Sequence, residues 1–399
     1  TGGPGTGKTT TINLMIRCFE MEKMDIVLAA PTGRAAKRMT EATGYEAKTI
    51  HRLLEVSGGI EDGDSSHFEK NEDNPIEADA VILDEMSMVD IHLMYSLLKA
   101  IVPGTRLILV GDSSQLPSVG PGNVLKDIID SKAFSVVRLS KIYRQAESSH
   151  IVLNAHKINA GELITLDNKN KDFFFFEKKD VRSVMGALVY LVKTRLPEYI
   201  GASPFEIQVL TPMRKGELGV EHLNEVLQYY LNPASESKKE KEGRIGVFRE
   251  GDKVMQVKNN YKLEWKITNS KGFSIEEGLG VFNGDMGIIK QINTYSERIT
   301  VVFDENREAE YPFSSLDELE LAYAITIHKS QGSEYPAVVL PLLSGPPILC
   351  NRNLLYTAIT RAQKCVAIAG RQSMVEQMIH NETEQKRYSG LNDCLKEGL

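Results

Sequence analysis

The chain has 399 residues, of which 42% are hydrophobic and 25% are charged, and its formal net charge is −7. This length is sufficient for two or more domains, and the composition is ordinary for a globular protein. No run of about 18 apolar residues occurs, so the sequence predicts no membrane span. The four cysteines show no metal-binding spacing, which favours buried or idle thiols in a reducing cytoplasm; they are Cys18, Cys350, Cys365 and Cys394.

The negative charge is concentrated in one acidic segment. Residues 55–79 contain nine acidic residues and one base, a sum of −8, so the rest of the chain sums to +1. A groove that binds a single nucleic-acid strand requires local basic and aromatic groups rather than a basic chain. The net charge therefore does not exclude nucleic acid as a partner.

The first ten residues match the phosphate-binding pattern G-x-x-x-x-G-K-[ST], and an apolar helical pattern follows at residues 11–19. Backbone N–H groups of such a loop point at phosphate oxygens, and the helix adds its positive end. We expect Lys8 to reach the β- and γ-phosphates of ATP and the Thr9 hydroxyl to bind Mg²⁺. The predicted nucleotide-contacting residues of the loop are Gly3, Pro4, Gly5, Thr6, Gly7, Lys8, Thr9 and Thr10.

Strands and helices alternate after this loop. Residues 26–30, 80–83 and 106–110 read as strands, with helices expected at 34–43 and 90–101. This alternation predicts a parallel, doubly wound sheet whose ligand lies at the carboxyl ends of the strands. A buried strand normally precedes a phosphate-binding loop, so we expect the chain to be truncated before Thr1 and to lack at least that strand.

Two of the predicted strands run directly into polar residues. Asp84 and Glu85 follow the strand 80–83, and Gln115 lies in the segment that follows the strand 106–110. We expect Asp84 to hold Mg²⁺, usually through water, and Glu85 to polarise the attacking water. Gln115 can sense the γ-phosphate, although a glycine- and proline-rich turn explains its segment equally well.

A second alternating series begins near Ser140 and is interrupted by a β-rich segment. Its strands are expected near 172–176, 206–210, 337–341 and 364–369, its helices near 181–195 and 219–231, and a charged linker at 233–244. Short β-runs split by Asn-Gly and Gly-Asp turns predict a small antiparallel β-barrel inserted in this series. The expected domains are a first lobe at 1–140, a second lobe at 141–250 and 316–399, and the barrel at 251–315.

Ordered motifs over nearly the whole chain resemble those of RecD-like DNA helicases, a branch of superfamily 1 that moves 5′→3′. The motifs lie at 1–10, 30–38, 49–54, 83–87, 111–122, 143–145, 210–213, 283–285, 326–334 and 356–361. The resemblance implies an α/β fold with two RecA-like doubly wound parallel-sheet lobes and a small SH3-like β-barrel inserted in the second. It also implies hydrolysis of ATP, with Mg²⁺, in the cleft between the lobes.

The resemblance assigns further residues to the nucleotide. Arg144 and Arg361 correspond to arginines that reach the γ-phosphate, a role that suits an always-charged, forked guanidinium. With Lys8, Glu85 and Gln115 they form the expected catalytic set. Gly332 and Glu334 are expected at the nucleotide, and Tyr143 either stacks on the adenine or is a core aromatic.

The resemblance also implies a strand-binding surface across both lobes. Hydroxyl groups and backbone N–H groups grip phosphates without reading bases, as a translocating motor requires. The expected DNA-contacting residues are Thr32, Gly33, Arg34, Thr49, His51, Thr211, Thr326, His328, Ser330 and Gln331. His51 and His328 fit core positions equally well. The acidic segment lies where the family carries a strand-separating pin, but its only aromatic residue is Phe68, which favours a solvated loop.

The predicted function is an ATP-dependent DNA helicase and translocase that moves 5′→3′ on single-stranded DNA and unwinds tailed or forked duplexes. Two alternatives stay open. One is a strand-stimulated ATPase that translocates without unwinding, and the other is a non-catalytic subunit that binds nucleotide and DNA. We expect no membrane partner and a cytoplasmic location, and the sequence identifies no protein partner.

Overall fold

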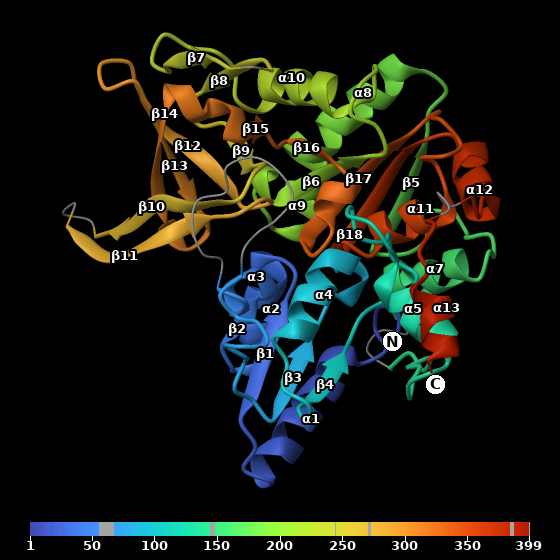
Figure 1. Cartoon of the computed structure of the whole chain (residues 1–399). Helices are drawn as coiled ribbons and strands as arrows, with labels where there is room; N and C mark the ends of the chain where they lie inside the picture. Colours follow the sequence, from blue (N-terminus) through green and yellow to red (C-terminus); the bar gives the residue numbers. More distant parts are fainter. Residues whose placement is uncertain (56–67, 144–147, 244, 270–272, 384–386, 399) are drawn as a thin grey trace.

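The computed structural model describes residues 1–55, 68–143, 148–243, 245–269, 273–383 and 387–398. Two parallel sheets and an antiparallel sheet organise these residues. In Figure 1 the first parallel sheet lies below the second, and the antiparallel sheet stands beside the second. No helix among the described residues has the length and apolar character that crossing a membrane requires.

The first sheet and its helices form the first lobe. The strand order is β2 (Ala47–Thr49), β1 (Ile26–Ala30), β3 (Ala80–Leu83) and β4 (Arg106–Leu109), and all pairings are parallel. Every residue of β3 is buried, as expected for an apolar strand inside a parallel sheet. The helices are α1 (Lys8–Met21), α2 (Gly33–Thr43), α3 (Ile50–Leu53), α4 (Ile91–Lys99) and α5 (Val124–Ser131).

The second sheet is also parallel and draws strands from both sides of the antiparallel module. Its order is β16 (Ala324–Thr326), β6 (Ile207–Thr211), β17 (Tyr335–Leu342), β18 (Ala362–Gly370) and β5 (Phe173–Glu177). The helices are α7 (His150–Asn159), α8 (Val181–Tyr190), α9 (Leu196–Ile200), α10 (Val220–Leu231), α11 (Arg352–Ile359) and α12 (Gln372–His380), with a π-helical stretch at Leu191–Arg195. The predicted helix at 181–195 therefore continues to residue 200. The last helix, α13 (Leu391–Glu397), packs against α5 of the first lobe.

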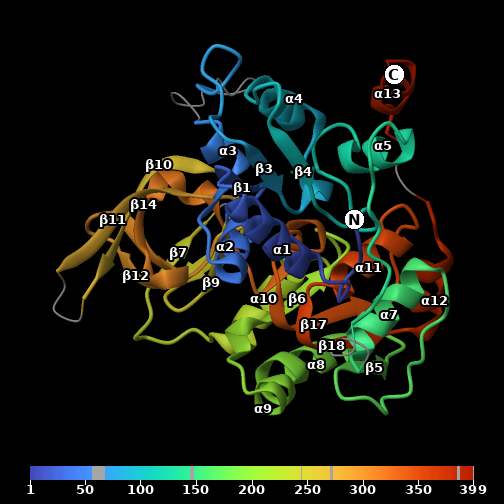
Figure 2. The same cartoon turned by 90° about the horizontal axis from the view of Figure 1, so that it is seen from below.

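The antiparallel module lies between the two parts of the second sheet in sequence. Its strand order is β11 (Ser274–Val281), β10 (Asn260–Thr268), β14 (Glu308–Pro312), β13 (Arg298–Phe303), β12 (Met286–Asn293), β9 (Lys253–Gln256) and β15 (Leu319–Leu321). The hairpin of β10 and β11 projects from the body of the molecule in both Figure 1 and Figure 2. The predicted fold of two α/β lobes with an inserted β-module is confirmed.

The predicted linker at 233–244 is wrong in its second half, because β7 (Glu240–Glu242) pairs with β8 (Val247–Arg249). The Arg249 side chain holds this hairpin by donating to Glu240 at 2.6 Å.

In the acidic segment, residues 56–67 lie outside the described residues. Phe68 packs against the first lobe's core, with its ring 6.0 Å from that of His51, so it is not an exposed tip.

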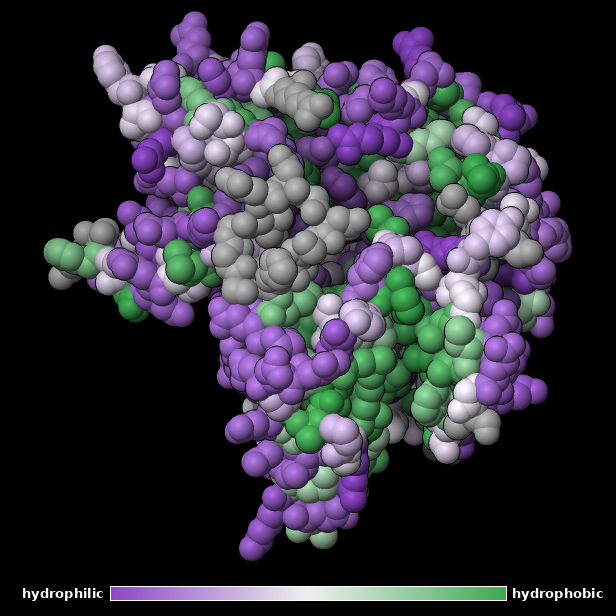
Figure 3. Space-filling model, in the orientation of Figure 1, coloured by the Kyte–Doolittle hydropathy of each residue, from purple (hydrophilic) through white to green (hydrophobic). Residues whose placement is uncertain are grey.

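An apolar groove runs along β4 of the first lobe. It encloses about 690 Å³, and its walls include Met15, Leu107, Leu109, Ile128 and Val137. Figure 3 shows the apolar surface that the first lobe presents around this region. The first two residues enter beside the groove, since Gly2 donates to the Gly111 carbonyl at 3.3 Å and Leu139 donates to the Thr1 carbonyl at 2.8 Å.

Candidate nucleotide cleft and strand-binding surface

The phosphate-binding loop has the backbone shape that its sequence predicts. Gly5 and Gly7 have φ angles of 72° and 85°, which glycine adopts without a Cβ clash, and α1 begins at Lys8 directly afterwards. The Lys8 ammonium donates to the carbonyls of Gly2 at 2.7 Å and Gly3 at 3.1 Å. The lysine therefore lies over its own loop, where phosphate oxygens would replace carbonyl oxygens as acceptors.

Asp84 and Glu85 follow β3 at the carboxyl edge of the first sheet. Burial, and next the Glu85 carboxylate, raise the pKa of Asp84. Burial also acts to raise the pKa of Glu85, but Arg38, Arg361 and Lys8 outweigh it, so that pKa is lowered. A cation at Asp84 would favour its ionised form, and this aspartate with the Thr9 hydroxyl offers the hard oxygen atoms that Mg²⁺ prefers.

Arg361 brings a buried cation from the second lobe to the same cleft. Its side chain is 2% exposed and donates to the Ser333 carbonyl at 3.2 Å, while its Nε has no partner. On the opposite side, the Oε1 of buried Gln115 is also unpartnered. Because buried polar atoms are nearly always hydrogen-bonded, these two orphaned atoms fit a site that accepts a polar ligand.

The other predicted nucleotide residues differ in their surroundings. Tyr143 is 58% exposed and lies against the phosphate-binding loop, where a Cβ on Gly7 would be 2.6 Å from its ring. The core-aromatic interpretation of Tyr143 is therefore wrong. Arg144 lies outside the described residues. Gly332, with a φ angle of 71°, packs against Thr32, and Glu334 pairs with Arg38 across the cleft.

The two lobes also meet directly at the phosphate-binding side. The Tyr356 hydroxyl donates to Asp112 at 2.6 Å, and the Leu116 amide donates to the Thr357 hydroxyl at 2.9 Å. Next to them, the His156 ring lies 3.1 Å from the Pro4 carbonyl of the loop. The nucleotide cleft is therefore bordered by hydrogen bonds that opening of the lobes must break.

Sequence reasoning missed three residues at this cleft. Asp112 and Tyr356 form a short hydrogen bond between the lobes at 2.6 Å, and Arg38 joins Glu85 to Glu334. Asp112 and Tyr356 lie inside recognised motifs, but no local pattern pairs residues that are 244 positions apart. The signal for Arg38 was its place within the motif at 30–38.

The first-lobe residues expected at DNA cluster at the starts of two helices. Thr32 caps α2 by accepting from the Ala35 amide at 3.2 Å, and Thr49 caps α3 by accepting from the Arg52 amide at 3.1 Å. Arg34 reaches Ser333 at 3.3 Å and its Nε has no partner, while Gly33 begins α2. Burial lowers the pKa of His51, so its ring favours the neutral form.

The second-lobe set is more enclosed. Thr211 and Ser330 are fully buried, and their hydroxyls donate to the carbonyls of Leu218 and Ile327, both at 2.7 Å. The side-chain amide of Gln331 donates to the Leu116 backbone carbonyl of the first lobe at 2.7 Å. These three side chains therefore do not offer their polar groups to a strand in this arrangement of the lobes.

Two second-lobe candidates are less enclosed. The Thr326 hydroxyl accepts from the Lys329 amide at 3.3 Å and remains half-buried. His328 is also half-buried, and burial followed by the Arg387 cation lowers its pKa.

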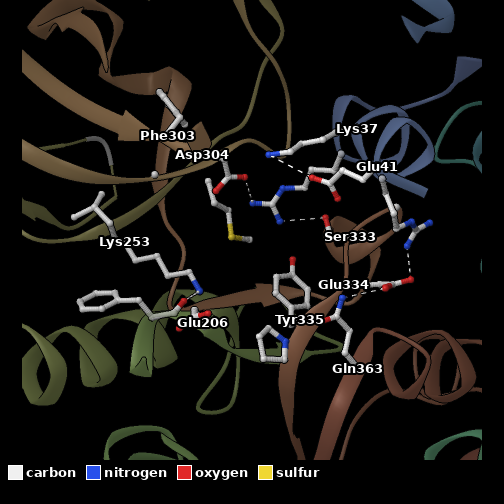
Figure 4. Close-up of a pocket in the computed structure, with 18 of the residues that line it drawn as sticks. Lys37, Glu41, Glu206, Lys253, Phe303, Asp304, Ser333, Glu334, Tyr335 and Gln363 are labelled. Atoms are coloured by element: carbon white, nitrogen blue, oxygen red, sulfur yellow. Dashed lines mark hydrogen bonds and ion pairs between the residues drawn. The ribbon is translucent and has the colours of Figure 1, made fainter. Parts of the chain in front are cut away.

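A separate cavity of about 630 Å³ opens where α2, the β-module and the second lobe meet. Figure 4 shows its wall, with Lys37 from α2, Asp304 and Lys253 from the module, and Ser333 and Glu334 from the second lobe. The residues lining this cavity do not include the phosphate-binding loop. It therefore borders the nucleotide cleft at Glu334 without being that cleft.

A phosphate-binding loop and strand-end acids on one sheet, faced by an arginine from a second sheet, define a two-lobed nucleotide-binding protein of the P-loop class. Three family models match in order: an AAA domain at residues 1–121, an ATP-dependent RecD-like DNA helicase SH3 domain at 223–303, and a UvrD-like helicase C-terminal domain at 321–369.

Curated relatives give the same result over most of the chain. The ATP-dependent RecD2 DNA helicase of Deinococcus radiodurans is 36% identical over 93% of this chain and 46% of its own length. The RecBCD enzyme subunit RecD of Mycolicibacterium smegmatis is 31% identical over 99% of this chain and 72% of its own. The chain belongs to the RecD-like DNA helicase family, although it spans about half the length of the Deinococcus relative.

Solved structures agree on the fold. A structure described as DNA unwinding at forked duplex DNA by two coordinating Pif1 helicases has a TM-score of 0.52 at 21% identity, over 94% of this chain and 88% of that one. Bacteroides Pif1 bound to single-stranded DNA has a TM-score of 0.51 at 20% identity, over 94% and 89%. At these identities the likeness concerns the fold alone.

Proposed function

We propose that this chain is the motor part of an ATP-dependent DNA helicase that moves 5′→3′ on single-stranded DNA and unwinds tailed or forked duplexes. One observation carries the proposal: Arg38 joins Glu85 of the first lobe to Glu334 of the second, and the buried Arg361 beside Ser333 has an unpartnered Nε at this junction. A triphosphate bound at Lys8 would thus be contacted by both lobes. Membership of the RecD-like family supports DNA as the track, and the direction rests on the family resemblance.

In the proposed cycle, ATP binding draws Arg361, and Arg144 with it, onto the γ-phosphate and closes the cleft. Glu85 accepts a proton from the attacking water, and Gln115 responds to the presence of the γ-phosphate. Asp84 and Thr9 would hold Mg²⁺, which neutralises phosphate charge when bound. Hydrolysis removes the arginine contacts, and the lobes reopen.

Movement follows if the two lobes alternate in their grip on the strand. ATP can favour closure only to the extent that it binds the closed state more tightly than the open one. The starts of α2 and α3 in the first lobe, and the segment from Thr326 to His328 in the second, are the proposed gripping surfaces. Each cycle would then advance the protein by one step along the strand, because hydrolysis resets the grip once.

ATP turnover with and without single-stranded DNA tests the proposal. DNA should stimulate turnover by the chain, and Lys8→Ala should abolish the stimulated turnover while leaving the melting temperature unchanged. Asn13→Ala is a matched control on the same helix, since Asn13 contacts the Ala42 carbonyl on the outer surface. Normal turnover by Lys8→Ala would contradict the assignment, and absence of nucleotide hydrolysis by the chain would favour the non-catalytic subunit.

A second function, translocation without unwinding, is favoured by one observation. Phe68, the aromatic residue available to a pin in the acidic segment, packs on the first lobe's core. Duplexes with a fluorescent label and either a 5′ or a 3′ tail separate the two functions. Unwinding of the 5′-tailed duplex supports the helicase, whereas DNA-stimulated hydrolysis without strand release supports the translocase.

A further inference from the structure

Arg38 lies at the junction of the two lobes and pairs with an acid on each. One guanidinium nitrogen donates to Glu85 of the first lobe, and the other donates to Glu334 of the second. The Glu85 side chain is 10% exposed and that of Glu334 is 35% exposed, so the pair with Glu85 is largely shielded from bulk water and the pair with Glu334 is partly open to it. Arginine is suited to this position because its fork presents donors in two directions at once.

The Arg38 contacts occupy the group that the proposed reaction requires. A carboxylate that accepts a charge-assisted hydrogen bond from a guanidinium is held in one orientation, and that bond competes with a water molecule for the same oxygen. Glu85 also has a backbone φ angle of 55°, a left-handed conformation that a non-glycine residue rarely adopts. The orientation of this carboxylate is therefore set by its unusual backbone and by Arg38.

The same helix connects Arg38 to the proposed DNA surface. Arg34 lies one turn earlier on α2, on the same face as Arg38, because residues four apart align along a helix. Arg34 donates to Ser333 while Arg38 donates to Glu334, so both arginines contact adjacent residues of the second lobe. A strand phosphate that takes Arg34 away from Ser333 would remove one of these two contacts and weaken the hold on the other.

We propose that Arg38 is a positioning residue that restrains Glu85 when no strand is bound, and that a strand gripped at the start of α2 releases this restraint. DNA stimulation of ATP hydrolysis would then arise partly from Arg38 leaving Glu85. This inference rests on the proposed function, because it concerns the rate of the same reaction. It adds a route by which occupancy of the strand-binding surface reaches the water-activating carboxylate.

The test measures kcat and KM for ATP, with and without a single-stranded oligonucleotide, for the chain and three variants. Arg38→Gln should raise the DNA-free kcat about tenfold, equivalent to about 1.4 kcal/mol, and lower the stimulation ratio by the same factor. The DNA-saturated kcat and the KM for ATP should stay close to those of the parent chain. A loss of folding would lower turnover, so a rise cannot come from structural damage.

Arg38→Lys tests the two-sided contact. A lysine ammonium keeps the charge but lacks the fork, so the DNA-free kcat should fall between those of the parent chain and Arg38→Gln. Lys37→Gln is the matched control, because Lys37 is on the same helix but pairs with Glu305 of the β-module at 2.9 Å. Its stimulation ratio should be unchanged.

Two results separate the possible failures. If the parent chain shows DNA-stimulated turnover and Arg38→Gln leaves the DNA-free kcat unchanged or lowers it, the restraint by Arg38 is refuted and the proposed function stands. If the parent chain does not hydrolyse ATP under any condition, the proposed function and this inference both fall.

Discussion

Replacing Tyr356 by phenylalanine removes a single oxygen atom from the contact between the lobes. The tyrosine is 1% exposed, and its hydroxyl donates to the Asp112 carboxylate, which is itself 2% exposed, at 2.6 Å. In the variant, the Asp112 carboxylate still accepts hydrogen bonds from the Ser114 backbone amide at 3.0 Å and from the Gln115 side-chain amide at 3.4 Å. A buried hydrogen bond to a charged group contributes about 1.5–3 kcal/mol, so the opening equilibrium of the lobes should rise by about 10- to 150-fold.

Hydrogen exchange at the Leu116 amide measures this opening. That amide donates to the Thr357 hydroxyl across the interface at 2.9 Å and is buried, so separation of the lobes exposes it to water. Its exchange should accelerate by the same factor in Tyr356→Phe. Tyr323→Phe is the matched control, since Tyr323 donates to Asp252 at 2.9 Å away from the cleft. Unchanged exchange at Leu116 in Tyr356→Phe, or equal acceleration in both variants, would refute the reasoning.

Three further predictions concern single residues. Arg361→Ala should bind ATP but hydrolyse it at least about 10³-fold more slowly in single-turnover measurements, and an unchanged rate would remove its role at the γ-phosphate. Thr49→Ala removes the cap of α3 and should lower the free energy of unfolding by about 1 kcal/mol in denaturant titrations, whereas no change would show that the cap is dispensable. Burial, followed by the Arg34 charge, lowers the pKa of Lys253 to about 7, below its usual 10.5. Between pH 7 and pH 10.5 the unfolded chain therefore binds more protons than the folded chain, so the free energy of unfolding should rise with pH in this range. Lys253→Met should flatten this rise, and an identical pH profile in the variant would contradict the assignment.

The sequence predicted those elements whose signals are local. β1, β3 and β4 are short apolar runs that end in turn or polar residues, and each appears within a residue of its expected bounds. The phosphate-binding loop was predicted for the same reason, because its glycine spacing constrains its own backbone. The domain boundaries and the roles of the predicted site residues stay predictions.

The rest of the site depends on contacts between distant segments. Nothing local distinguishes Thr211, which is buried with an internal partner, from Thr326, which remains half-buried. The hairpin at 240–249 was missed because charged residues on an exposed two-stranded ribbon resemble a linker in composition. Arg38 was not singled out because a basic residue on an amphipathic helix usually faces solvent, and here both of its acidic partners arrive from other segments.

The attachment of the phosphate-binding loop has a mechanical consequence. Thr1 and Gly2 are tied on one side to Gly111, just beyond β4, and on the other to Leu139. Load applied to the loop when the lobes close is therefore shared between two neighbouring backbone segments. The stiffness of the phosphate-binding loop therefore depends on the Leu139 segment as well as on the segment that follows β4.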